Sequence, residues 1–229
     1  LIAVADSQGN VRGYCQEPGL LLYPEDTVEL EGRPYFGYMR GGYSAEEIRA
    51  IDDYADSLGI EVIACIQTLG HMGQMLKWGE PFRSVRDTGE VMLVDAPETA
   101  ELIEKMLQFW SENLRSRRIH VGMDETHDLG RGRFMDLNGY ESGFSMFNRH
   151  LAMVNELCAK YNLDPMIWSD MYFRYPGKVG DFHRESTISP EIAEKIPDVD
   201  MVYWDYYNTE EAFYSDIMKK HEELGKTTC

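Results

Sequence analysis

Two adjacent carboxylates, Asp124 and Glu125, follow the short run at 118–123, and a histidine, His127, comes two residues later. Burying a charge costs free energy, so an acid pair behind an apolar run needs a reason. Side chains alternate between the faces of a strand, so two neighbours can share a pocket only where the chain bends. We therefore predict a strand at 118–125 that ends at the pair and opens onto a cleft.

Polar and aromatic side chains end other apolar runs in the same sense. They are Glu25 and Asp26 after 20–24, Gln67 and His71 after 60–67, Trp168 and Asp170 within 165–173, and Trp204, Asp205, Tyr206 and Tyr207 within 199–207. One such residue is often structural: a carboxylate can cap a loop, a histidine can be buried, and a tryptophan can belong to the core. Polar or aromatic residues of this kind occur at four strand ends in the same sense, which favours a functional site. In a parallel α/β barrel the carboxyl ends of the strands carry the active site.

The elements that must position these residues are short strands alternating with amphipathic helices. We expect strands at 19–26, 60–67, 118–125, 165–173 and 199–207, and helices at 44–59, 97–114, 145–162 and 209–225. Runs that are apolar on both faces are typical of parallel strands covered by helices. The sequence therefore predicts an α/β fold of the (β/α)8 TIM-barrel type. About six βα units fit into a single, partial catalytic domain over 1–229, since a barrel takes about 250 residues.

Composition narrows the partners. The net charge of −18 argues against nucleic acid or an anionic membrane surface. No apolar run approaches the roughly 20 residues that span a bilayer, and the first residues do not resemble a signal peptide. The four scattered cysteines form no CxxC pair. Cys65 in an apolar strand and Cys158 in a helical pattern indicate buried thiols, and hence a reducing, cytoplasmic compartment. No GxGxxG or GxxxxGK[ST] motif is present, and we expect no cofactor. The oligomeric state is left open.

The mixture of carboxylates and aromatic rings indicates a carbohydrate substrate. Aromatic faces stack on the C–H face of a pyranose, and Asp side chains accept hydrogen bonds from its hydroxyls. Cleavage of a glycoside also needs a protonated acid near a second negative group.

These residues carry a resemblance to a known family. The stretch "HVGMDET" at 120–126 resembles the H-x-G-x-D-E signature of family 20 glycoside hydrolases, the β-N-acetylhexosaminidases. The stretch at 41–71, "MIWSDM" at 166–171 and "VYWDYYN" at 202–208 are also similar to that family. The resemblance covers roughly residues 20–225.

The resemblance implies substrate-assisted, retaining hydrolysis of a terminal GlcNAc or GalNAc, in which the 2-acetamido oxygen of the substrate is the nucleophile. Glu125 would then be the general acid and base, and Asp124 would orient the acetamido group. Tyr207, or less favourably Tyr206, would hold the acetamido oxygen. The remaining residues that the resemblance places at the substrate are Trp168 and Trp204 as walls, His71 backed by Asp26 as a partner of Glu125, and Asp170 and Asp205 for hydroxyl contacts or pocket support.

Two departures from the family keep other functions open. Gln67 stands where many members have Asp, and the first residues hold no arginine that matches the one with which the family grips sugar hydroxyls. One alternative is a non-catalytic sugar-binding or truncated barrel. Another is a metal-dependent barrel hydrolase or isomerase, with ligands from His71, His120, Asp124, Glu125, His127 and Asp170. The absence of HxH and HExxH spacing argues against the metal enzyme, and we expect no metal.

Overall fold

The core of the molecule is a parallel sheet of five strands in the order β1-β2-β3-β4-β5, which is also their order in the chain. The structure is a computed structural model that describes residues 19–24, 27–175, 186 and 188–224. The elements are β1 (Gly19–Leu22), α1 (Ala45–Ser57), β2 (Glu61–Cys65), α2 (Gly73–Leu76), the 3-10 helix η1 (Glu80–Val85), α3 (Pro97–Asn113), β3 (Arg118–His120), α4 (Arg133–Asn138), α5 (Gly143–Lys160), β4 (Asp164–Trp168), α6 (Asp170–Arg174), α8 (Pro190–Ala193), β5 (Asp200–Val202) and α9 (Glu211–Glu223).

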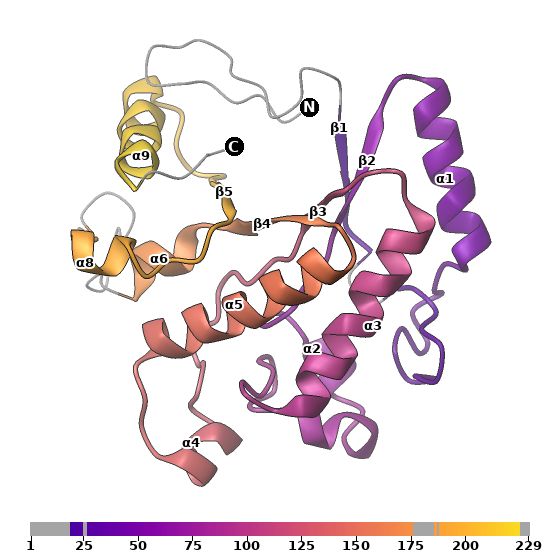
Figure 1. Cartoon of the computed structure of the whole chain (residues 1–229), viewed down its shortest axis with the longest axis horizontal. Helices are drawn as coiled ribbons and strands as arrows, with labels where there is room; N and C mark the ends of the chain where they lie inside the picture. Colours follow the sequence, from indigo (N-terminus) through magenta and orange to yellow (C-terminus); the bar gives the residue numbers. More distant parts are fainter. Residues whose placement is uncertain (1–18, 25–26, 176–185, 187, 225–229) are drawn as a thin grey trace.

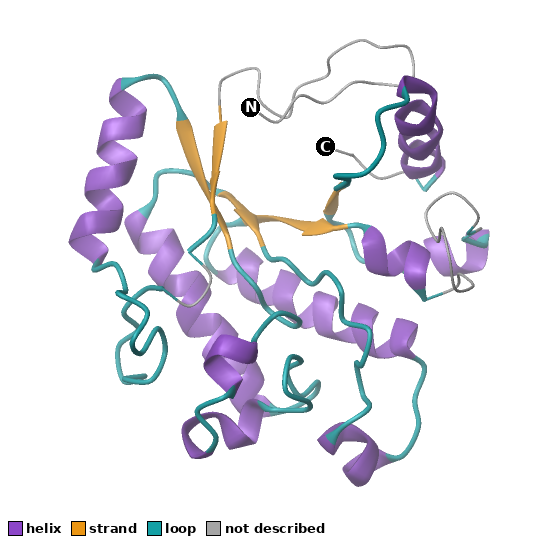
Figure 2. Ribbon diagram, turned by 180° about the vertical axis from the view of Figure 1, so that it is seen from behind, coloured by secondary structure: helices purple, strands orange, loops and turns teal. Residues whose placement is uncertain are grey.

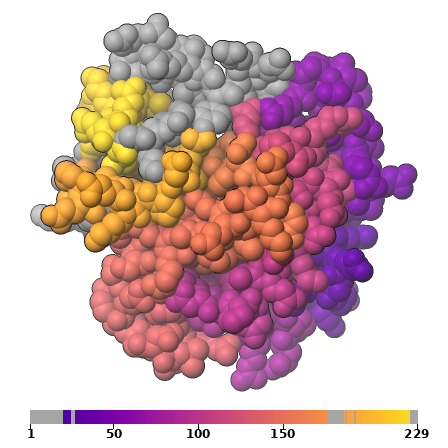
Figure 3. All heavy atoms as spheres, in the orientation of Figure 1, coloured from indigo at the N-terminus to yellow at the C-terminus, as the bar shows by residue number. Residues whose placement is uncertain are grey.

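Helices cover one side of the sheet. Figures 1 and 2, drawn from opposite sides, show α3 and α5 in front of the strands in one view and behind them in the other. In β2, the residues from Val62 to Cys65 are all buried, the pattern typical of a parallel strand with neither face open to solvent. In Figure 3 the segments around residues 150–170 (orange) lie between the indigo N-terminal part and the yellow C-terminal helix.

The helix ends follow the predicted signals. Ser44 caps α1 in a capping box: its N–H donates to Glu47 Oε2 (2.8 Å), and its Oγ accepts from Glu47 N (3.3 Å). Gly59 follows α1 with a φ of +68°, a left-handed conformation that suits glycine. Pro97 begins α3.

The strands are shorter than predicted. Strand β3 ends at His120 and not at 125, because Gly122 and Met123 have φ angles of +72° and +71°, which no regular strand adopts. The prediction of a strand over 165–173 is wrong in its second half, where residues 170–174 form α6. In the range 199–207 only residues 200–202 are a strand.

The described residues contain five strands, against about six expected βα units. A single domain over 1–229 stays a prediction. Among the described helices, none combines the length and apolar character needed to cross a membrane.

Candidate active site

The acid pair lies in a tight loop behind β3. Gly122, Met123 and Glu125 all have left-handed backbones, the last with a φ of +48°. This conformation is uncommon for residues other than glycine. A side chain at Gly122 would collide with the Gln67 amide and the Ile66 carbonyl, so glycine is required there. The bends place Asp124 and Glu125 beside the same histidine, which confirms that the pair can face one place although a strand could not present it.

Side chains from the end of β3 and from the segment after β2 hold the backbone of this loop. His120 Nδ1 accepts from Gly122 N (3.1 Å), and Gln67 Oε1 accepts from Met123 N (3.2 Å). Buried backbone donors are rarely left unpaired. These bonds therefore explain how an irregular segment is tolerated next to the core.

Asp124 is clamped by two donors. Gln67 Nε2 donates to its Oδ1 (2.8 Å), and His71 Nε2 lies 3.2 Å from its Oδ2. The side chain is only 15% exposed. Burial alone would raise the pKa of Asp124, but the hydrogen bonds from His71 and Gln67 outweigh burial and bring the pKa below its ordinary 3.8. Asp124 is therefore a fixed negative charge at neutral pH.

His71 joins the two acids. Its Nε2 also lies 3.4 Å from Glu125 Oε2. The hydrogen bond to Asp124 is the main cause of a raised pKa for His71; burial opposes it, and the charges of Asp124, Glu125 and Glu90 add to it. On its other side Glu125 faces His127, with 4.0 Å between Oε1 and Nε2. The Glu125 side chain is 44% exposed, so its carboxyl can reach a bound ligand.

The buried His120 of β3 packs against the partly buried Trp168 of β4, and a buried acid follows at the start of α6. The rings of His120 and Trp168 lie 4.2 Å apart. Burial lowers the pKa of His120 to about 3, so this imidazole is neutral. Asp170, at the start of α6, is fully buried and accepts from Glu125 N through Oδ2 (3.0 Å). Burial, followed by the charges of Asp124 and Glu125, raises the pKa of Asp170 to about 7.

A cavity of about 560 Å³ opens beside His71 and contains two charged residues that sequence reasoning missed. It is lined by Tyr23, Arg40, Cys65, Gln67, His71, Gly73, Gln74 and Glu90. Arg40 lies between β1 and α1, and Glu90 lies between η1 and α3. Neither residue ends a strand, so the strand-end pattern could not find them. The only signal was an arginine followed by two glycines in a long loop. Arg40 places a guanidinium at this cavity.

The residues after β5 form a cluster of their own. Asp205 accepts from Tyr203 Oη (3.0 Å), Tyr207 N (2.6 Å) and Asn208 N (3.2 Å), which is the bonding of a turn. Tyr206 and Tyr207 are more than 80% exposed. Within the described part of the chain, no hydrogen bond or ring contact joins them to the acid pair.

Two further predicted residues complete this account. The Trp204 ring lies 5.8 Å from that of Tyr206. Its Nε1 is buried and has no hydrogen-bond partner among the described residues. Asp26 lies outside the described residues.

One donor set could also suit a cation. His71, Asp124 and Glu125 offer one ligand atom each within 4.8 Å of one another. Asp124 already receives hydrogen bonds from both Gln67 and His71, and this pattern is that of an acid held by donors. The cluster therefore keeps the metal alternative open without favouring it over acid–base chemistry.

At the carboxyl ends of these parallel strands lie an ionised acid, a second acid open to a ligand, and a histidine between them. This arrangement is suited to acid–base chemistry. Residues 23–212 match the catalytic domain model of glycosyl hydrolase family 20, and the chain belongs to this family. The predicted resemblance is thereby confirmed.

Two curated relatives are similar in sequence. Hexosaminidase D of Homo sapiens is 28% identical over 201 residues, which are 82% of this chain and 38% of that protein. Hexosaminidase D of Bos taurus is 27% identical over 198 residues, which are 82% of this chain and 54% of that protein. The chain therefore spans about two fifths to one half of the length of these relatives.

Solved structures confirm the fold class. The β-N-acetylhexosaminidase from Bacteroides fragilis superposes with a TM-score of 0.66 at 14% identity, over 92% of this chain and 43% of that one. A family 20 enzyme from Streptomyces coelicolor gives 0.63 at 17% identity, over 92% and 41%. A mutant Streptomyces plicatus β-hexosaminidase, in complex with its product GlcNAc, gives 0.61 at 17% identity, over 91% and 40%. The five-stranded sheet is thus part of a TIM-barrel-type α/β fold.

Proposed function

We propose that this chain removes a terminal N-acetylhexosamine from a β-glycoside by substrate-assisted, retaining catalysis. Glu125 gives its proton to the glycosidic oxygen while the bond from that oxygen to C1 breaks. The 2-acetamido oxygen of the substrate forms a new bond to C1, which gives a cyclic oxazolinium intermediate. Glu125, now a carboxylate, takes a proton from the water that reopens the ring. The family membership and a GlcNAc-bound structural neighbour support this proposal.

The observation that carries the proposal is the contrast between the two acids. Asp124 is almost covered and held by two donors, whereas Glu125 is nearly half exposed. A fixed carboxylate can accept a hydrogen bond from the acetamido N–H and stabilise the positive charge that develops on the sugar ring. An exposed acid can reach the leaving group. Because the nucleophile belongs to the substrate, the enzyme needs no carboxylate placed to attack C1.

Other residues would complete the sugar site. Trp168 and Trp204 would contact the ring of the sugar, and Tyr207, or else Tyr206, would donate to the acetamido oxygen. Arg40 and Glu90 at the cavity would contact the hydroxyls. Asp205 would act by fixing its turn, since its oxygens are bound to groups of the same loop.

The test compares 4-nitrophenyl N-acetyl-β-glucosaminide with 4-nitrophenyl β-glucoside. If the acetamido group is the nucleophile, kcat/KM for the plain glucoside falls by at least about 1,000-fold, since an oriented internal nucleophile is worth several kcal/mol. Equal rates on the two substrates would contradict substrate assistance. Binding of GlcNAc with no turnover of either substrate would instead support the non-catalytic sugar-binding barrel.

The metal-dependent hydrolase is the second candidate, because three ligand atoms lie within 4.8 Å. Dialysis against a chelator separates the two candidates. Unchanged activity supports the acid–base mechanism. Loss of activity that added Zn²⁺ or Mn²⁺ restores would favour the metal enzyme.

A further inference from the structure

The backbone of Glu125 is held in an unusual state by one contact. Its φ of +48° lies in the left-handed region, which only glycine adopts without strain. Its N–H donates to Asp170 Oδ2 at 3.0 Å. Strained conformations persist only where the surroundings determine them. The Asp170 carboxyl is therefore part of what keeps Glu125 turned this way.

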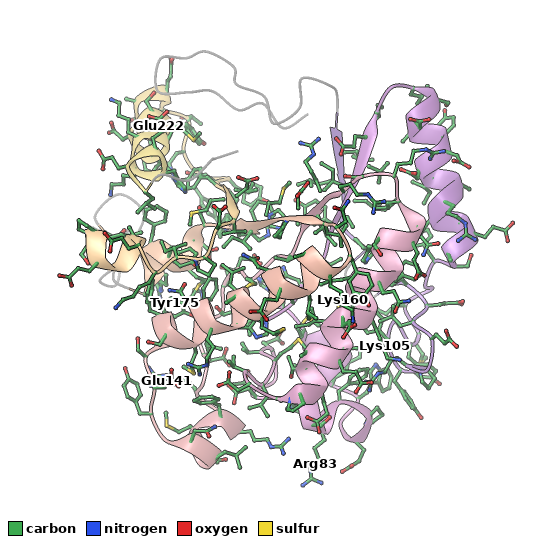
Figure 4. The ribbon with its side chains drawn as sticks, in the orientation of Figure 1. Arg83, Lys105, Glu141, Lys160, Tyr175 and Glu222 are labelled. Atoms are coloured by element: carbon green, nitrogen blue, oxygen red, sulfur yellow. The ribbon has the colours of Figure 1, made fainter. Side chains whose placement is uncertain are left out.

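The short helix α6 grips this loop at a second point. Tyr175, directly after α6, approaches Thr126, with 3.1 Å between Tyr175 Oη and Thr126 Oγ1. Tyr175 is labelled in Figure 4, and its ring packs on Phe147 of α5 with centroids 5.7 Å apart. Gly70 closes the loop from the other side, because any larger residue there would collide with the Asp124 carbonyl and Thr126. The loop that carries Asp124 and Glu125, here called the acid loop, is thus held between Tyr175, directly after α6, and Gly70 in the loop after β2.

Asp170 has no other visible reason to be an acid. It is 1% exposed, and its Oδ1 has no partner among the described residues. A buried carboxyl with an unpaired oxygen is costly. Asp170 stands at the first position of a helix of only five residues, so the stabilisation gained from a carboxylate at this helix end is small. Among the described residues, the charged or titratable groups around it are Asp124, Glu125 and Tyr175, and none of these is a cation.

We propose that Asp170 is the positioning residue of Glu125: its buried carboxyl fixes the left-handed backbone and thereby aims the Glu125 carboxyl at the leaving group. The proposal deepens the hydrolase function above and rests on the role of Glu125 as the general acid. Of the two sequence-based expectations for Asp170, hydroxyl contacts or pocket support, it takes the second, because the side chain is only 1% exposed.

Kinetics of two variants test this role. Asp170→Ala removes the acceptor, and misplacing a reacting group by about 1 Å can cost about 100-fold. We expect about that loss in kcat on a disaccharide, whose leaving group must be protonated. On a 2,4-dinitrophenyl glycoside the loss should stay below about tenfold. Asp170→Asn keeps an acceptor oxygen for Glu125 N and should recover most of the activity. Ser169→Ala is the control, since Ser169 is equally buried and its hydroxyl has no partner in the described part of the chain.

A second measurement does not depend on activity. The backbone amide of Glu125 should exchange its hydrogen at least about tenfold faster in Asp170→Ala than in the wild type, as judged by NMR or mass spectrometry. Asp170→Asn and Ser169→Ala should leave this exchange unchanged. If Asp170→Ala does not fold, Asp170→Ser takes its place, because the serine hydroxyl is one bond too short to reach the amide.

The outcomes separate the two proposals. An inactive wild type with the expected exchange pattern would overturn the hydrolase function but support the structural half of this inference. An active wild type in which Asp170→Ala loses equally on both substrates, or in which Glu125 exchange does not change, would overturn the positioning role.

Discussion

Replacing Gln67 by methionine is the most informative single change in the site. Gln67 binds the acid loop twice: it donates to Asp124 Oδ1 (2.8 Å) and accepts from Met123 N (3.2 Å). Methionine has a similar length but makes neither bond. The change therefore leaves Asp124 with His71 as its remaining side-chain donor and leaves the Met123 amide unpaired.

The expected size follows from these two losses. A hydrogen bond to a charged group contributes about 1.5–3 kcal/mol, and Asp124 is 15% exposed, so water replaces the lost donor poorly. If the transition state depends on that charge being fixed, kcat/KM should fall by about 10- to 150-fold. The unpaired Met123 amide should cost about 1–3 kcal/mol of unfolding free energy. For a domain of this size that corresponds to a Tm lower by about 2–12 °C.

The assay is kcat/KM on 4-nitrophenyl N-acetyl-β-glucosaminide, together with the affinity for a thiazoline analogue of the cyclic intermediate. Gln74→Met is the matched control, because Gln74 lines the same cavity but its Oε1 accepts from Lys77 and not from the acid loop. Activity within threefold of the wild type, or an equal loss in the control, would refute the reasoning that Gln67 orients Asp124.

Three further predictions concern the same residues. Glu125→Gln should lose most activity on natural glycosides and much less on substrates with activated leaving groups; a comparison of kcat on both types checks this, and equal losses would count against the acid role. His71→Gln should destabilise the protein most between pH 3.8 and 6.5. The raised pKa of His71 stabilises the folded state in full below its ordinary pKa of 6.5, and this contribution is lost as the pH rises through the pKa in the folded state. The lowered pKa of Asp124 stabilises the folded state in full above its ordinary pKa of 3.8, and this contribution is lost only as the pH falls below that value. Melting curves of both proteins from about pH 4.5 to 9 test this, and a difference that does not shrink at high pH would contradict it. The double variant Asp124→Asn with Tyr207→Phe should cost less in kcat/KM than the sum of the single changes if both residues hold the acetamido group; additive costs would separate Tyr207 from Asp124.

Local signals in the sequence predicted the sheet and its helices well. The alternation of apolar runs, Ser44 with Glu47, and Pro97 placed α1, β2 and α3 within a few residues. The pattern predicts strands that are too long, because Val121 continues the apolar run while the Met123 amide at the bend donates its hydrogen bond to a distant residue, Gln67. Such a long-range contact leaves no local pattern.

The sequence predicts a strand where the structure has the short helix α6. Met171, Tyr172 and Phe173 form a brief apolar run that is buried in the helix, and periodicity cannot distinguish a helix from a strand over so few residues. The acid pair itself was predictable, because two carboxylates behind an apolar run are rare in a core. The charged residues of the cavity, Arg40 and Glu90, were not, because long loops bring them in.

The order of the strands also bears on how the site is made during synthesis. Each strand pairs with the one that precedes it in the chain, so the sheet can grow in the direction in which the ribosome delivers it. The acid loop is an exception, since it is bound by Gln67 from before it and by Asp170 from after it. A nascent chain in which Asp170 has not yet emerged from the ribosome can form β1, β2 and β3. It still lacks the contact that turns the Glu125 backbone. The acid is therefore set in place only after β4 has paired, so the chemistry of the site becomes available late in folding.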